Sequence, residues 1–149
     1  MKEKYAYVMM IREKWWREFL RLHREGKEFQ SYVQRGLGPP KTAHMLFFYV
    51  TKPLCEVAGC AEFVERKVGN AKDLWKEHGG ESVLESAEQY FQFVKDANPV
   101  SFIRFKNLRE AANSVPLQNL LMLLGVKRLA RRGFYVDRET AEKLVAFME

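Results

Sequence analysis

Residues 5–24 read Tyr-Ala-Tyr-Val-Met-Met-Ile-Arg-Glu-Lys-Trp-Trp-Arg-Glu-Phe-Leu-Arg-Leu-His-Arg. The first seven of them, Tyr5 to Ile11, form a near-continuous apolar run rich in Tyr, Val and Met, which predicts a buried strand. From Arg12 to His23 the apolar residues recur at helical spacing and arginines alternate on the other side, which predicts an amphipathic helix. Gly26 follows the last basic turn, where a helix commonly ends. The chain therefore opens with a strand followed directly by a helix.

The rest of the chain continues to mix strands and helices. Further strands are expected at Phe29 to Val33, His44 to Thr51, Leu54 to Val68, Val100 to Phe105 and Phe134 to Val136. The stretch Leu54 to Val68 is one long bent strand or a hairpin, with Gly59 at a bulge. Because no regular βαβ repeat is present, the pattern favours an α+β fold over a doubly wound sheet. At 149 residues the chain is expected to be one domain, residues 1–149.

A helical insertion is expected around residues 70–95. Asn70 is placed to cap a short helix that ends at Gly79-Gly80. Ser82 to Glu85 has the spacing of a capping box, which predicts a second helix running to about Lys95. Later in the chain, Leu117 to Leu124 forms a helix introduced by Pro116 and ended by Gly125, and Asp137 caps a last amphipathic helix.

The net charge of +6 is distributed unevenly along the chain. Residues 1–53 hold 11 Lys or Arg against 5 Asp or Glu, a balance of +6, and residues 99–149 hold 9 against 5, a balance of +4. Residues 54–98 hold 5 against 9, a balance of −4. Basic segments attract phosphate-rich ligands, whereas an acidic segment repels them. The alternative is an ordinary solvated surface of uneven charge.

The composition points to a cytoplasmic protein. No apolar run approaches the roughly 20 residues that span a bilayer, and Arg12 and Glu13 end the first apolar stretch too early for a secretory signal. We therefore expect no membrane partner. Cys55 and Cys60 stand alone as a C-x4-C pair, so two reduced, partly buried thiols are expected, with neither a disulfide nor a metal site.

Motifs of known catalytic chemistry are missing from the sequence. It contains no G-x-S-x-G, H-E-x-x-H, Walker loop or Rossmann glycine pattern. The histidines at positions 23, 44 and 78 are scattered, and no pair of carboxylates stands out for acid–base work. No cofactor is expected, and nothing here points to catalysis.

Binding chemistry is better represented, first between Arg12 and Lys41. Cations in this stretch alternate with aromatic residues, and a Gly/Pro loop follows at residues 36–40. Cations hold phosphates, and exposed rings stack on unpaired bases. The tryptophans at positions 15 and 16 point about 100° apart on a helix. The sequence leaves open, for each of them, whether it is a core residue or a stacking residue. The candidate contacts are Lys14, Trp16, Arg17, Lys27, Tyr32, Arg35 and Lys41.

A second candidate is the basic cluster that precedes Gly133. It comprises Lys127, Arg128, Arg131 and Arg132, of which the three arginines are predicted nucleic-acid contacts. On a helix, residues four apart would crowd like charges together, and an anionic partner would relieve that repulsion. A solvated basic surface without a ligand is the alternative.

The order of elements resembles that of ASCH domains, which belong to the PUA-like superfamily. The resemblance rests on Ile11-Arg12-x-Lys14-Trp15-Trp16 opening a helix after an apolar strand, and on Glu25-Gly26-Lys27 leading into the next strand. An uncharacterised archaeal branch of the superfamily is the nearest match. The resemblance implies a small mixed β-barrel with flanking helices, and a cleft that commonly recognises RNA or modified nucleotides.

Some ASCH proteins are small amidohydrolases that act on acylated cytidine through a Lys, a Thr and a Glu. The family's lysine lies in a G-x-K-T-x-E-x-R stretch. Here Gly26-Lys27-Glu28-Phe29 has the lysine one place early and lacks the threonine, with Ser31 as the nearest hydroxyl. By this resemblance Lys27 and Glu62 would be the catalytic candidates.

The sequence as a whole favours a module that binds RNA or a nucleotide through a basic cleft, without catalysis of its own. The alternatives are the small amidohydrolase and a protein-interaction adaptor that uses the acidic helices. The binding module predicts one basic face with the Gly/Pro loop on its rim and the acidic insertion turned away. The oligomeric state is left open.

Overall fold

The structure is a computed structural model in which residues 3–149 are described. Its elements in chain order are β1 (Ala6–Ile11), α1 (Glu13–Arg24), β2 (Phe29–Arg35), β3 (Met45–Val50), β4 (Glu56–Gly69), α2 (Ala71–His78), the 3-10 helix η1 (Gly79–Glu81), α3 (Ala87–Val94), β5 (Val100–Pro116), α4 (Leu117–Leu124), β6 (Phe134–Val136) and α5 (Arg138–Met148). The predicted α+β class is confirmed.

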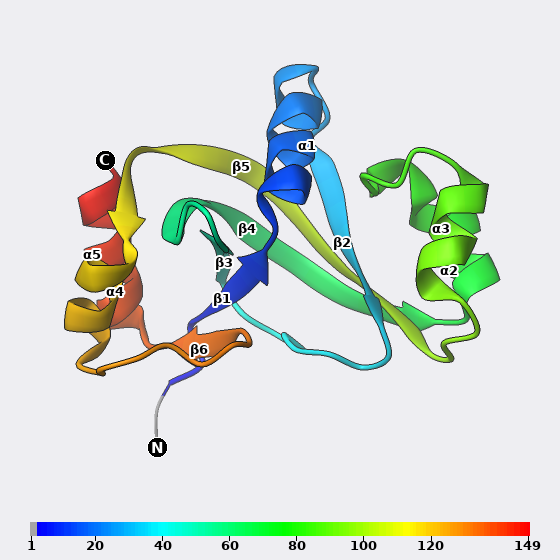
Figure 1. Cartoon of the computed structure of the whole chain (residues 1–149). Helices are drawn as coiled ribbons and strands as arrows, with labels where there is room; N and C mark the ends of the chain where they lie inside the picture. Colours follow the sequence, from blue (N-terminus) through cyan, green and yellow to red (C-terminus); the bar gives the residue numbers. More distant parts are fainter. Residues whose placement is uncertain (1–2) are drawn as a thin grey trace.

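The strands described form one mixed sheet in the order β2-β5-β4-β3-β1-β6. β1 and β3 run parallel, from Ala6 opposite Met45 to Ile11 opposite Val50, and the other neighbours are antiparallel. In Figure 1, α1 stands above the middle of the sheet, α4 and α5 lie at one end, and α2 and α3 lie at the other. The helices therefore flank a sheet that runs the length of the molecule.

The expected β-barrel is not formed, because the sheet is open. Among the strands described for residues 3–149, its edges are β2, whose one strand neighbour is β5, and the three-residue β6, whose one strand neighbour is β1. The loop of residues 36–44 passes between these edges, where the backbone N–H of Lys41 donates to the Tyr135 hydroxyl at 3.3 Å. A loop therefore occupies the place where closure would need a ladder of backbone hydrogen bonds.

The apolar runs of β1 and β3 are buried on both faces. Tyr7, Met9 and Ile11 pack with α1 on one side, and Ala6 and Val8 pack with α4 and α5 on the other. β3 follows the same alternation. A strand covered on both faces has no polar positions, which is why these segments read as continuous apolar runs.

Gly59 has no room for a side chain, because Trp16 lies directly over it. A Cβ at this position would come within 2.6 Å of the Trp16 ring and 2.4 Å of the Arg109 carbonyl. The pairing of β4 also shifts register between Val57 and Gly59, which confirms the predicted bulge. Residues 56–69 form one long strand, so the hairpin alternative for this stretch is wrong.

The helical insertion lies between β4 and β5, as predicted, but its second helix begins later than expected. Ser86, not Ser82, caps α3, and its hydroxyl accepts from the Gln89 N–H at 3.2 Å. Ser82 instead accepts from the Leu84 N–H at 2.9 Å and pairs with Ser31 of β2 in an isolated bridge. The backbone of residues 83–86 that follows this bridge is not helical, so the helix begins only at Ala87.

An ion-pair network attaches the insertion to the sheet. Arg104 of β5 donates to both carboxylate oxygens of Glu81 at 2.9 Å and to Glu65 at 2.5 Å, and the Ser31 hydroxyl donates to Glu81 at 2.7 Å. Burial of the Glu81 carboxyl raises its pKa, but the hydrogen bonds from Arg104 and Ser31 outweigh burial and hold the pKa below its usual value. The negative charge of Glu81, at the base of the insertion, is therefore balanced by the positive charge of Arg104.

Helices long and apolar enough to cross a bilayer do not occur between residues 3 and 149.

Candidate nucleic-acid interface

Three tyrosines from three strands lie together beneath α1. The rings of Tyr7 (β1) and Tyr135 (β6) meet edge to face, with centroids 4.9 Å apart. The pKa of Tyr7 is raised to about 12, mainly by burial and further by Tyr135 and Tyr32 (β2), while the nearby Arg132 guanidinium acts in the opposite direction. Tyr7 belongs to the core cluster beneath α1, and Tyr32 and Tyr135 both pack against that cluster. We call Tyr7, Tyr32 and Tyr135 the tyrosine cluster.

The Gly/Pro loop borders the tyrosine cluster. Besides the contact between Lys41 and Tyr135, the Gln34 side chain donates to the Pro39 carbonyl at 3.0 Å, and Arg66 donates to the Gly38 carbonyl at 3.2 Å. These bonds fix the loop to β2 and β4. The backbone of the exposed residue Lys41 is thereby held beside the Tyr135 hydroxyl.

The basic cluster at residues 127–132 is in a loop, because residues 125–133 have no regular secondary structure. The helical spacing considered for its charges therefore does not apply. Gly133 ends the loop against Tyr7, where an added Cβ would lie 2.3 Å from the hydroxyl oxygen and 2.5 Å from the ring. Only a glycine lets the backbone approach this closely, and the approach brings Arg132 to the tyrosine cluster.

The two tryptophans have different places. Trp16 is 4% exposed and packs on Phe48 at 5.2 Å, so it cannot stack on a ligand, and its predicted contact with a base is wrong. Trp15 is half-buried and lines a cavity of about 50 Å³ with Tyr32, Val83 and Phe93. That volume is far below the roughly 300 Å³ of an ordinary ligand pocket.

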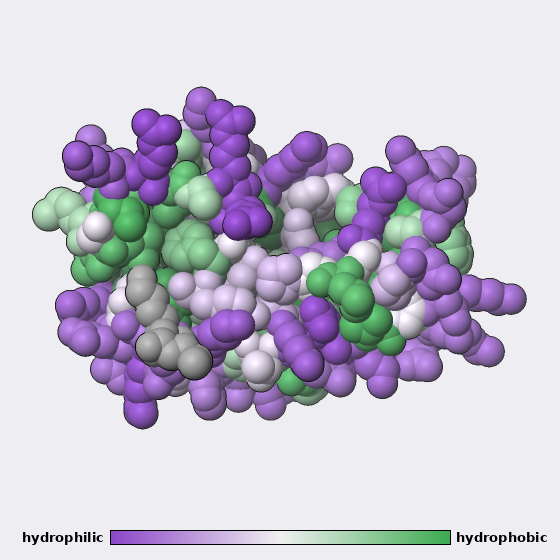
Figure 2. Space-filling model, turned by 90° about the horizontal axis from the view of Figure 1, so that it is seen from below, coloured by the Kyte–Doolittle hydropathy of each residue, from purple (hydrophilic) through white to green (hydrophobic). Residues whose placement is uncertain are grey.

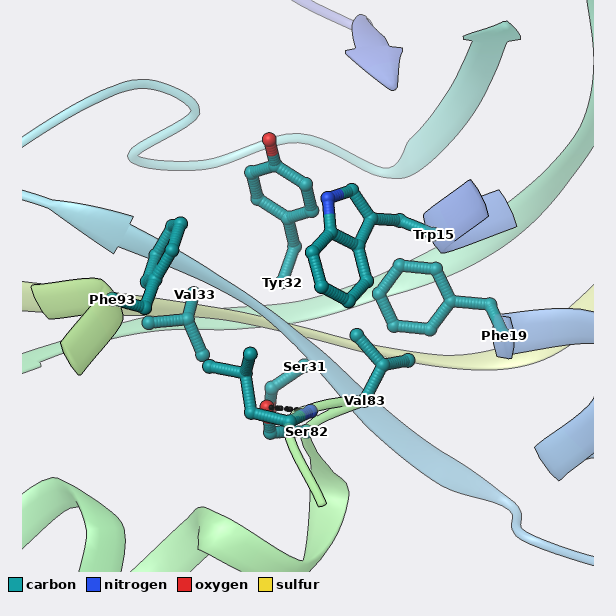
Figure 3. Close-up of a pocket in the computed structure, with 9 residues that line it drawn as sticks. Trp15, Phe19, Ser31, Tyr32, Val33, Ser82, Val83 and Phe93 are labelled. Atoms are coloured by element: carbon teal, nitrogen blue, oxygen red, sulfur yellow. Dashed lines mark hydrogen bonds between the residues drawn. The ribbon is translucent and has the colours of Figure 1, made fainter. Parts of the chain in front are cut away.

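Figure 3 shows how Trp15 and Tyr32 are oriented in this cavity. The indole nitrogen of Trp15 and the hydroxyl of Tyr32 point the same way, away from the Ser31–Ser82 side. Burial raises the pKa of Tyr32, while the nearby Arg12 lowers it. The polar ends of both rings are therefore directed away from the insertion that closes the cavity.

The cations of α1 are largely neutralised by the helix itself. Arg17 pairs with Glu13 at 3.3 Å, and Arg21 pairs with Glu18 at 2.8 Å and Glu25 at 2.6 Å. Intrahelical pairs of this kind form because residues three or four apart are neighbours on a helix. This face of α1 is therefore not the strongly positive surface that its arginine content implies.

Lys14 also lacks the expected basic surroundings. Its ammonium lies 4.9 Å from the Trp15 ring centre, and the residue lines a cavity together with Glu18 and with Glu85 of the insertion. The expectation that the acidic insertion is turned away from the basic residues is therefore wrong on this side of the molecule. The insertion is held against the sheet at Glu81, which accepts hydrogen bonds from Arg104 of β5 and from Ser31 of β2.

A separate group of cations has no carboxylate partner. Within residues 3–149 none of the ion pairs includes the exposed residues Arg12, Arg35, Lys41, Lys52, Lys127, Arg128, Arg131 and Arg132. Several of them are on the two loops that border the tyrosine cluster, residues 36–44 and 126–133. Lys4, whose ammonium lies 5.0 Å from the centre of the Tyr135 ring, likewise takes part in no ion pair among residues 3–149. We call Arg12, Lys41 and Arg132, which contact or act on a member of the tyrosine cluster, the unpaired cations.

Lys27 and Glu62 are not brought together. Lys27 donates to the Gly80 carbonyl and lines a cavity beside Trp75. Glu62 accepts from Asn107 at 2.8 Å and lines a different cavity, beside His44. In the described part of the chain no cluster of His, Cys, Asp or Glu side chains is placed to hold a metal ion.

The sequence did not single out Tyr7, Tyr135 or Arg12. Tyr7 is part of the apolar run of β1 and reads as a core residue, and Tyr135 lies in a three-residue strand. The one available signal was the glycine at position 133 between a basic loop and an aromatic strand. Figure 2, which views the molecule from below, shows pale side chains in the middle, green, hydrophobic ones on either side of them, and purple, hydrophilic ones projecting around.

Solved structures with this architecture identify the fold. A serine-to-alanine variant of ZmASCH from Zymomonas mobilis superposes with a TM-score of 0.80 at 17% identity, over 100% of both chains. ZmASCH itself gives 0.77 at 19% identity, over 99% of this chain and 98% of that one. The chain has the ASCH fold. An NMR structure of a Rhodopseudomonas palustris protein is more distant, with a TM-score of 0.51 at 12% identity over 97% of this chain.

This chain and the ASCH structures thus share a fold although their sequences are no more than 19% identical. The sequence matches no protein-family model and no curated protein. The similar structures come from Zymomonas mobilis and Rhodopseudomonas palustris, and they give no support to the expected archaeal branch. Of the ASCH expectation, the mixed sheet with flanking helices is confirmed, whereas the closed barrel is not formed.

Proposed function

We propose that this protein binds single-stranded RNA, or a nucleotide, at the tyrosine cluster and the two loops that border it. The observation that carries the proposal is the contrast between the two sets of basic residues. The arginines of α1 are paired with carboxylates, whereas Lys41 and Arg132 beside the cluster are not.

Cations without a carboxylate partner suit phosphate binding, because their contact with a nucleic acid releases the counterions that are condensed on its phosphates. A cation already paired with a neighbouring carboxylate contributes less, since the ligand must displace that partner. The proposal therefore moves the predicted contacts away from Arg17 and toward Arg35, Lys41, Arg128, Arg131 and Arg132. Arg12, which acts on Tyr32, joins them.

Aromatic groups supply the second part of the interaction. Tyr32 and Trp15 are half-buried, and their polar ends point to the same side. A ring held in this way offers a stacking face to an unpaired base and loses little side-chain entropy on binding. Tyr32 remains the predicted stacking residue, and Trp15 replaces Trp16 beside it.

The proposal is tested by the salt dependence of binding to a fluorescein-labelled single-stranded RNA. The Lys41→Ala, Arg132→Ala double variant should bind more weakly, and the slope of log K against log salt should fall by about 1.4, since each phosphate contact on a single strand contributes about 0.7. Tyr32→Ala should weaken binding by about 1–3 kcal/mol with little change of slope, while Tyr32→Phe retains affinity.

The matched control is the Arg17→Ala, Arg21→Ala double variant, which removes the same charge from α1. Its slope should stay close to that of the unaltered protein, because both arginines are already paired. If the two double variants lower the slope equally, the interaction is non-specific attraction to net charge. Absence of measurable RNA affinity at low salt would remove the proposal altogether.

The two alternatives from the sequence remain predictions. Lys27 and Glu62 line different cavities, which gives an amidohydrolase no assembled pair of catalytic groups. Hydrolysis of acetylcytidine that is lost in Lys27→Ala would revive that alternative. A stable protein complex lost when the acidic helices are altered would favour the adaptor.

A further inference from the structure

A cavity of about 580 Å³ lies on the other side of the loop that carries the basic cluster. Its walls come from the ends of β1 and β3, the turn after β3, the helix α4 and residues 127–131. This volume is within the range of small-molecule sites, roughly 300–1,000 Å³. The cavity is separate from the tyrosine cluster, but the two share one loop.

The polar part of the lining is dominated by positive charge. Lys52, Lys127, Arg128 and Arg131 all line the cavity, and no Asp or Glu does. None of the four takes part in an ion pair within the described residues 3–149. Four like charges around one cavity repel one another, and a multiply charged anion would remove that repulsion.

The floor of the same cavity is apolar and partly aromatic. Leu117 and Leu121 are one helical turn apart on α4, and Leu129 and the Tyr49 ring lie with them in the lining. Tyr49 is only 6% exposed, so packing around it holds the ring in place. A ligand that fits this cavity therefore has a flat or apolar body and an anionic end.

The loop links this cavity to the tyrosine cluster. Arg131 lines the cavity, while the next residue, Arg132, acts on Tyr7 in the cluster. Neighbouring residues of one loop thus border the cavity and act on the tyrosine cluster.

We propose that this cavity receives the terminal nucleotide of a bound RNA, with its base on the apolar floor and a terminal phosphate among the four cations. The inference rests on the proposed function. A terminal phosphomonoester carries about −1.5 to −2 charges at neutral pH, compared with one for an internal phosphodiester. Four unpaired cations therefore match the charge of a terminal phosphate better than that of an internal phosphodiester.

The test begins with free mononucleotides, whose binding does not depend on the rest of an RNA chain. Isothermal titration would compare adenosine 5′-monophosphate and adenosine 3′-monophosphate with adenosine and with inorganic phosphate. At least one monophosphate should bind roughly tenfold or more tightly than adenosine or inorganic phosphate, because a charge-assisted contact adds to the apolar one. The better of the two identifies which chain end is recognised.

Two variants locate the binding. The Arg128→Ala, Arg131→Ala double variant should lose roughly tenfold or more of the monophosphate affinity, and Ala130→Trp should block the cavity without changing charge. Circular dichroism checks that each variant is folded. The matched control, Lys72→Ala with Lys76→Ala, removes two exposed cations of α2 at the other end of the molecule and should bind normally.

Monophosphates that bind no better than adenosine or inorganic phosphate would overturn the inference, as would an equal loss of affinity in the α2 control. A second measurement compares labelled RNAs that end in a phosphate or in a hydroxyl. If both bind equally, the cavity proposal fails while RNA binding at the tyrosine cluster stands. If neither binds but mononucleotides do, the proposed function fails and the cavity remains a nucleotide site.

Discussion

Arg104 donates one hydrogen bond of 2.9 Å to each oxygen of the Glu81 carboxylate, and this pair joins β5 to the insertion between β4 and β5. The side chain of Arg104 is 16% exposed and that of Glu81 is 18% exposed. A two-pronged pair that is largely shielded from water has a defined geometry. The pair therefore determines where the insertion sits relative to β2 and α1.

Replacing Arg104 by Met should destabilise the protein by about 2 kcal/mol, since hydrogen bonds to charged groups are worth about 1.5–3 kcal/mol and a partly buried carboxylate is left without its partner. Urea unfolding followed by circular dichroism measures the change. The Arg104→Met, Glu81→Leu double variant should recover part of the loss, because no unpaired charge remains. A double variant no more stable than Arg104→Met would contradict this account.

Acid should weaken the same contact. Burial raises the pKa of Glu81, but the bonds from Arg104 and Ser31 outweigh it and hold the folded pKa below the ordinary 4.5. On acidification the unfolded chain takes up its proton first, so the contribution to stability is complete above 4.5 and is lost as pH falls through the folded pKa. The difference in unfolding free energy between the unaltered protein and Glu81→Gln should therefore be larger at about pH 6 than at about pH 3. A constant difference would show that Glu81 does not titrate with folding.

Gly133→Ala should displace the basic loop from the tyrosine cluster. Its Cβ would lie 2.3 Å from the Tyr7 hydroxyl, and Tyr7 is 6% exposed and cannot move aside freely. Overpacking of this kind costs about 1–3 kcal/mol, and RNA affinity should fall as Arg132 moves. Urea unfolding and RNA titration measure the two effects. The control is Gly80→Ala, where an added Cβ meets no atom within 4 Å; equal effects in both variants would rule out the close approach as the cause.

Local patterns were enough to place most elements. The apolar runs of β1 and β3 are buried on both faces, and such strands carry their signal in a short window. Asn70, Gly125 and Asp137 cap their helices as predicted, because a cap depends on a few neighbouring residues. Ser82 had the same local signal but pairs with Ser31, fifty-one residues earlier, and long-range pairing does not appear in a local pattern.

The candidate site was less accessible to sequence reasoning. The basic residues were visible, but whether each had a carboxylate partner was not, so Arg17 and Arg132 looked equivalent. The sequence also did not decide which of the two adjacent tryptophans is buried, because a rotation of the helix about its axis could bury either one. The bulge at Gly59 and the contact with Phe48 decide that Trp16 is the buried one.

The sequence by itself determined the α+β class, the order of strands and helices, the acidic insertion and the two basic ends, because these follow from periodicity, capping and composition within short windows. Only the tertiary structure decided that the sheet stays open, that Tyr7, Tyr32 and Tyr135 meet, and that the basic loop at residues 127–132 divides a tyrosine cluster from a cavity. The physical reason is that burial and ion pairing depend on residues brought together from distant parts of the chain, where spacing along the sequence carries no information.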